Sequence, residues 1–134
     1  MEKVIVEVNY TGKNYGAHLP ELQGVVSTGE SLEEVVRNIR EAVDFHLDGM
    51  REDGAAVPAV FDGEYEFEYR LTTEALLHAY SGIFTKAALA RITGINERQL
   101  WHYESGIRKP RPAQRKRIED GLHKLAAQLL SITL

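Results

Sequence analysis

The chain contains no cysteine, so disulfides, thiolate zinc sites and cysteine nucleophiles are excluded. It also lacks long apolar runs, and no stretch approaches the roughly 18 residues that a membrane-spanning helix needs. Its first residues do not combine a basic segment with an apolar stretch, as a secretory leader does. From these absences we expect a soluble, cytoplasmic protein with no membrane association.

What is present is a marked division of charge. The chain has 134 residues, 43% of them hydrophobic, which suffices for one ordinary domain or two small ones. Residues 1–71 contain six Lys/Arg and fifteen Asp/Glu, for a net charge of −9, whereas residues 72–134 contain ten and five, for +5. The overall charge of −4 therefore conceals a basic segment, as expected where a nucleic-acid-binding domain is joined to a domain with another role.

The acidic half is predicted to fold as one sheet with a helix packed on it. Short β-branched or apolar segments predict strands at residues 3–10, 15–19 and 25–28. Residues 64–71 alternate strictly between apolar and charged side chains, which indicates a half-buried strand. Between them, an apolar row at helical spacing predicts a helix, and the order is β-β-β-α-β.

The ends of that helix are marked by local signals. Ser31 and Glu34 form a capping box, in which the serine oxygen accepts from the amide of Glu34 and the Glu34 side chain reaches back to the cap amide. Gly54 is expected to end the helix in a left-handed conformation.

Residues 15–34 also resemble a known family. Their aromatic strand, the Pro-x-Leu-x-Gly motif at Pro20–Gly24 and the Thr-x-Gly-x-Ser-x-Glu-Glu motif at residues 28–34 are similar to those of the HicB antitoxins. The resemblance covers roughly residues 3–70. It implies a truncated ribonuclease-H-like fold without the nuclease site, a homo-oligomer, and a domain that blocks the small ribonuclease toxin HicA.

The carboxylates and histidines of this half do not indicate catalysis. A two-metal nuclease needs carboxylates converging at one sheet edge, whereas Glu64, Glu66 and Glu68 alternate outward along a strand. Solvated faces are the better interpretation, and some of these acids are candidates to meet a basic toxin. His18 and His46 lack partners at metal-ligand spacing, so we expect packing or surface histidines, with no metal, cofactor or enzymatic activity.

The basic half has the pattern of a helix-turn-helix. Thr73 is expected to cap a first helix and Thr85 a second. Gly94 supplies the turn, Asn96 caps the next helix, and Gly106 ends it in a left-handed conformation. Residues 85–117 hold nine Lys/Arg against two Glu, for a net charge of +7.

The first turn of the helix after Gly94 carries side chains suited to reading base edges. Arginine matches the guanine edge and glutamine the adenine edge in the major groove. The N-terminal positions of such a helix face the bases in helix-turn-helix proteins. The predicted base-reading residues are Glu97, Arg98, Gln99 and His102. Trp101 was the ambiguous neighbour, and packing at least partly into the core was favoured over contact with the sugar-phosphate backbone.

Residues 100–112 resemble the Xre/Cro-type repressors, which share an aromatic or aliphatic residue, Glu-x-Gly, a basic loop and a proline. The resemblance covers roughly residues 75–126 and implies that the loop delivers cations to phosphates. It carries no information on the DNA sequence, and a basic helical domain that contacts only proteins is the alternative. The predicted phosphate contacts are Thr85, Lys86, Arg108, Lys109, Arg111, Arg115 and Lys116.

Pro112 is expected to begin a last helix with an apolar row, and the segment 129–134 is too apolar for a solvated tail. It is expected either to pack on the core or to belong to a dimer interface.

Together the halves predict an α+β protein with an antitoxin domain, residues 1–71, and an all-α helix-turn-helix domain, residues 72–134. The expected function is that of an antitoxin that neutralises a HicA-type mRNA interferase and represses its own operon. Its expected partners are the toxin, double-stranded operator DNA and further copies of the chain in a homodimer or homotetramer. The alternative is a stand-alone transcriptional regulator whose first domain serves oligomerisation or ligand sensing.

Overall fold

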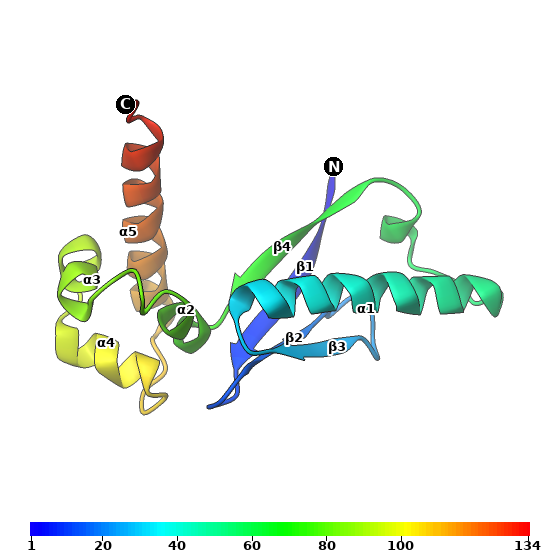
Figure 1. The fold of residues 1–134 in the computed structure, drawn as a ribbon, viewed down its shortest axis with the longest axis horizontal. Coiled ribbons are helices and arrows are strands. Elements are labelled where there is room, and N and C mark those ends of the chain that lie inside the picture. The colour runs from blue at the N-terminus through cyan, green and yellow to red at the C-terminus, as the bar shows by residue number, and fades with distance from the viewer. The chain divides into compact units, whose positions relative to one another are not determined.

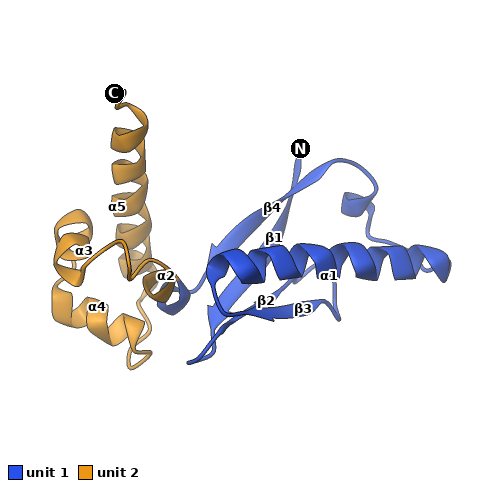
Figure 2. Ribbon diagram, viewed as in Figure 1, with its two compact units in different colours: residues 1–75 blue, residues 76–134 orange.

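A computed structural model describes residues 1–134 and shows an α+β protein with a mixed four-stranded sheet and five α-helices. The chain divides into two compact units, unit 1 with residues 1–75 and unit 2 with residues 76–134 (Figure 2). None of the helices is both long and apolar enough to span a membrane.

Unit 1 is built on the sheet, and the expected β-β-β-α-β order is confirmed (Figure 1). The spatial order of the strands is β3-β2-β1-β4, with β1 antiparallel to β2, β2 antiparallel to β3, and β1 parallel to β4. The strands are β1 (Glu2–Tyr10), β2 (Tyr15–His18), β3 (Val26–Gly29) and β4 (Tyr65–Leu71).

Helix α1 (Leu32–Glu52) covers one face of this sheet and contacts β2 and β3 (Figure 1). Its buried residues recur every four positions and pack with three fully buried valines of the central strand β1. Burying such a row is the main stabilising term for an amphipathic helix. The row on α1 is Val35, Ile39, Val43 and Leu47, and the valines on β1 are Val4, Val6 and Val8.

The expected signals end α1, with one difference. The Ser31 Oγ accepts from the Glu34 amide at 3.1 Å, as the capping box predicts. The Glu34 carboxylate, however, accepts from the amide of Glu30 at 3.4 Å, one residue before the expected partner. Gly54 has a φ of +68° just after the helix, the left-handed conformation that glycine adopts without steric cost. A short 3₁₀ helix, η1 (Ala59–Phe61), precedes β4.

Unit 2 contains helices only, and the division between the units falls within α2. Thr72 caps α2, because its Oγ1 accepts from the Ala75 amide at 3.1 Å, so the expected cap at Thr73 was placed one residue too late. The helices are α2 (Thr73–Ala79), α3 (Lys86–Thr93), α4 (Glu97–Glu104) and α5 (Pro112–Leu130). Their shared core is formed by Leu77, Leu89, Ile95, Leu100, Tyr103 and Ile118.

A glycine allows α3 and α5 to cross closely. Gly121 is buried in the middle of α5, and a Cβ built there would lie 2.7 Å from the carbonyl oxygen of Ile92 on α3. Any larger residue would force the helices apart, because real Cβ atoms do not approach an oxygen so closely. The glycine is thus required by packing, although it weakens an isolated helix.

Candidate functional site

The candidate site lies in unit 2, where α3 and α4 are joined by a short capped turn. Thr85 caps α3 by accepting from the Ala88 amide at 3.0 Å. Gly94 ends α3 with a φ of +75°, and its amide donates to the Ala90 carbonyl at 2.9 Å. Asn96 then caps α4 by accepting from the Gln99 amide at 2.8 Å. These local hydrogen bonds define where each helix begins, so the turn is specified by sequence.

The outer face of α4 is formed by four exposed residues. Leu100 and Tyr103 point into the core, while Glu97, Arg98, Trp101 and Ser105 are exposed. The first, third and fourth of these exposed residues follow one another at intervals of four, which places them in one line along a helix. Trp101 is 55% exposed, so the expectation that it packs into the core was wrong.

Gln99 and His102 lie at the margin of this face rather than on it. Both are half-buried, and the Gln99 Nε2 donates to the Tyr103 hydroxyl at 3.1 Å. The Nδ1 of His102 is buried and makes no hydrogen bond within the protein. Glu97 and Arg98 are therefore the better placed of the four predicted base-reading residues.

Lys86 is held inside unit 2. Its ammonium donates to the Glu104 carboxylate at 2.8 Å, and the two side chains are only 5% and 11% exposed. The same nitrogen lies 4.4 Å from the ring centroid of Trp101, within the range of a cation–π interaction. This position argues against the expected phosphate contact, since the charge is buried and already paired. Lys86 instead supports the inner side of Trp101.

The other predicted phosphate-contacting residues are all exposed. They lie at the start of α3, in the α4–α5 loop and in the first turns of α5, and they are Thr85, Arg108, Lys109, Arg111, Arg115 and Lys116. Lys116 makes only an exposed ion pair, with Asp120 at 3.4 Å. Gly106, at a φ of +80°, ends α4 and starts the loop, as the sequence predicts. Cations therefore flank the exposed end of α4.

The sequence interpretation missed Trp101 and the role of Glu104. The spacing of 97, 101 and 105 was a signal that could have identified Trp101 as part of the outer face. No local signal points to Glu104, since its partner Lys86 is eighteen residues away.

Unit 1 presents carboxylates on the sheet face that α1 leaves open. Glu66 of β4 pairs with Lys3 at 3.6 Å, and Glu68 with Arg70 at 3.9 Å, all of them substantially exposed. His18 lies 3.3 Å from Glu7. No three His, Asp or Glu side chains converge as metal ligands would.

The other face of β4 is aromatic. Phe61, Tyr65, Phe67 and Tyr69 make successive ring contacts, and Arg40 of α1 donates to the Tyr69 hydroxyl at 2.8 Å. Burial raises the pKa of Tyr65 above its ordinary value, and the nearby carboxylate of Asp44 raises it further, against a lowering effect of Arg51.

Comparison with known proteins gives matches to the first part of the chain and to relatives of limited coverage. A family described as "HicB_like antitoxin of bacterial toxin-antitoxin system" matches residues 3–69, half of the chain. A UPF0150 protein of Helicobacter pylori is 40% identical over 52 residues, which are 39% of this chain and 69% of that protein. An uncharacterized 14.9 kDa protein from the rep-hol intergenic region of Haemophilus phage HP1 is 39% identical over 44 residues, and the match spans 33% of each chain.

Proposed function

Because the chain belongs to the family of HicB-like antitoxins of bacterial toxin–antitoxin systems, we propose that unit 1 blocks a HicA-type mRNA interferase and that unit 2 represses the operon of the pair. Members of this family are regulatory components that interact with a toxin, and the chain is accordingly not an enzyme. The proposal concerns the identity of the toxin, the truncated ribonuclease-H-like relationship of unit 1, and DNA binding by unit 2.

The acidic surface of unit 1 supports the toxin-binding part. A ribonuclease that acts on RNA needs a basic surface, and complementary charge orients two proteins and speeds their association. The exposed carboxylates Glu64, Glu66 and Glu68 lie on or next to β4, at one edge of the sheet. Glu41, Asp44, Asp48 and Glu52 are exposed on α1.

The observation that carries the DNA-binding part is the outer face of α4. It presents Arg98 and Trp101 at the surface, next to a loop and a helix start that are rich in exposed cations. In a helix-turn-helix such a face enters the major groove while the surrounding cations contact phosphates. The turn at Gly94 and the caps at Thr85 and Asn96 are those that this motif needs.

Repression further requires two copies on one operator. A pseudo-palindrome is read by recognition helices that are related by a two-fold axis and lie about 34–36 Å apart. We therefore propose a homodimer, or a homotetramer made of two such dimers, as the DNA-binding form.

Fluorescence anisotropy with the chain's own promoter and a scrambled duplex tests the DNA-binding part. Arg108→Ala and Lys109→Ala should weaken binding to both duplexes alike, and each should lower the salt slope by roughly 0.9, one phosphate contact. Arg98→Ala should cost about 1–3 kcal/mol on the promoter only. Arg91→Ala, an exposed cation of α3 outside the predicted set, is the control. The proposal fails if the wild-type chain ignores both duplexes at low ionic strength.

Co-expression tests the toxin-binding part. The small open reading frame next to the gene for this chain should arrest growth when expressed alone, and co-expression of this chain should restore growth. The two products should also co-purify. If the neighbouring product neither arrests growth nor binds this chain, the HicA-type assignment is wrong.

A further inference from the structure

Helix α5 carries an apolar row that is covered at its start and open at its end. Ile118, Leu122, Leu125 and Leu129 recur at spacings of four, three and four, and Ile132 follows three residues later; we call these five residues the α5 row. Alternating spacings of three and four are typical of a helix that packs along a second helix. Ile118 is 2% exposed, whereas Leu129 and Ile132 are 58% and 59% exposed.

The surroundings of the open end do not suit solvent. Residues 125–134 contain no charged side chain, and Leu130 and Leu134 are exposed in the same segment. The C-terminal half of α5 extends beyond α3 and α4 of unit 2 (Figure 1). Thus the terminal segment does not pack on the core, one of the two positions that the sequence suggested for it. A contiguous apolar surface of this kind is unusual on a monomer and marks an association site.

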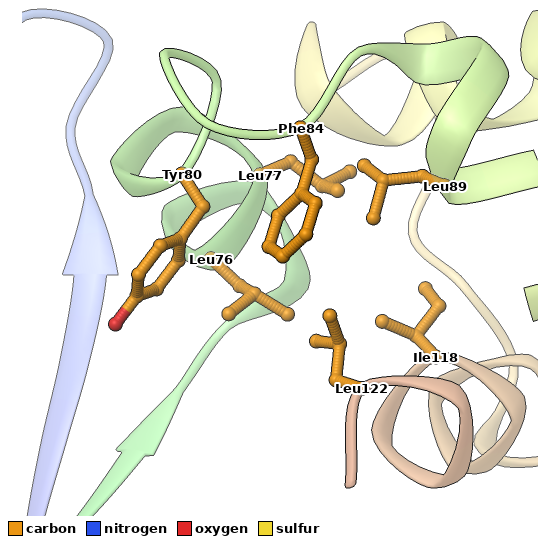
Figure 3. Close-up of a pocket in the computed structure, with 7 residues that line it drawn as sticks. All are labelled: Leu76, Leu77, Tyr80, Phe84, Leu89, Ile118 and Leu122. Carbon is orange, nitrogen blue, oxygen red and sulfur yellow. The ribbon is translucent and has the colours of Figure 1, made fainter. Parts of the chain in front are cut away.

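A pocket lies beside the start of the open part of the row. Leu122 lines it from α5, facing Leu76 and Tyr80 of α2, with Phe84 from the α2–α3 connection (Figure 3). These lining side chains are only partly buried, and the lining is apolar apart from the tyrosine hydroxyl. Unit 2 therefore has both a projecting apolar end and an apolar hollow on one helix. An interface between two identical copies needs this kind of self-complementary surface.

We propose that α5 of a second copy of this chain covers the α5 row, in antiparallel orientation about a two-fold axis near Leu125. This arrangement places Leu122 of each copy opposite Leu129 of the other and brings the terminal residues of each copy to the pocket of its partner. DNA is a poor occupant, because the segment has no cation to meet a phosphate. The inference rests on the proposed repressor role and names the surface that joins two α4 helices for one operator.

Sedimentation without DNA, on the full chain, tests the interface. Leu129→Glu should halve the mass of the wild-type assembly and weaken self-association by roughly 100-fold or more, because each substitution acts twice across a two-fold axis. Circular dichroism should stay unchanged, since the replaced side chain is exposed in one copy. Ala127→Glu adds the same charge on the opposite side of α5 and should leave the mass unchanged.

Cysteine cross-linking tests the orientation, because the natural chain has no cysteine to interfere. Leu125→Cys, close to the axis, should form a disulfide-linked dimer on mild oxidation, whereas Ala127→Cys should not. A wild-type chain that sediments as one copy, an undiminished assembly of Leu129→Glu, or equal cross-linking of both cysteine variants would overturn the proposal.

DNA binding measured on the same samples separates the two proposals. Dimers that depend on Leu129 but ignore DNA would refute repression and leave the interface standing. DNA binding with a Leu129→Glu assembly of wild-type mass would refute the interface alone.

Discussion

The buried pair of Lys86 and Glu104 allows a prediction with a defined magnitude. The distance of 2.8 Å between ammonium and carboxylate corresponds to an attraction of about 6 kcal/mol at an effective dielectric constant near 20, before the cost of desolvating both groups. Removing one partner leaves the other charge buried and unpaired, which typically costs about 3–5 kcal/mol. A unit the size of residues 76–134 has a total stability of about 3–9 kcal/mol. Glu104→Leu or Lys86→Met alone should therefore largely unfold unit 2.

The double variant Lys86→Met/Glu104→Leu should be far more stable than either single variant, because no charge remains buried. Urea unfolding followed by the fluorescence of Trp101, the one tryptophan of the chain, reports on unit 2, and circular dichroism provides a second signal. A cost below about 1 kcal/mol for Glu104→Leu, or a double variant as unstable as the sum of the singles, would refute the reasoning.

Three further predictions concern packing, DNA contact and pH. Gly121→Ala should destabilise unit 2, because its Cβ would lie 2.7 Å from the Ile92 oxygen, whereas Gly49→Ala in α1 meets no atom within 4 Å and should stabilise unit 1 by about 0.5–1 kcal/mol. Thermal unfolding checks both, and an unchanged Gly121→Ala variant would contradict the close crossing. Promoter DNA should quench the fluorescence of Trp101 by more than scrambled DNA does, and no change on saturation would place the indole outside the interface. The pKa of Tyr65 is higher in the folded state, so unit 1 should lose stability as the pH rises above about 10, where the unfolded tyrosine ionises first. Tyr65→Phe should reduce that loss between pH 9 and 11 in urea unfolding, and an identical pH dependence would show that another group controls it.

Local patterns predicted the elements of unit 1 well. The alternation of β4 and the four-residue period of α1 appear in the structure as exposed and covered faces. The Ser31 cap formed as expected because its hydrogen bond joins residues three positions apart. Interactions of this range are specified by neighbouring residues, whatever the rest of the chain does.

The candidate site could be predicted only in part. Thr85, Gly94 and Asn96 occupy their expected places, since caps and left-handed turns are also local. Lys86, beside the Thr85 cap, was taken for a phosphate contact, because its sequence neighbours do not indicate burial. The assignment of Trp101 to the core was wrong for a related reason, since an aromatic residue in an amphipathic helix is usually placed inside.

Sequence alone determined the charge division, the ends of the helices, the alternation of β4 and the resemblance that the family match later supported. Only the tertiary structure decided that Lys86 lies inside, that Trp101 lies outside, and that α5 extends beyond its own core with an uncovered apolar end. The physical reason is that hydrogen bonds of caps and turns join residues a few positions apart, whereas burial depends on how separate helices pack.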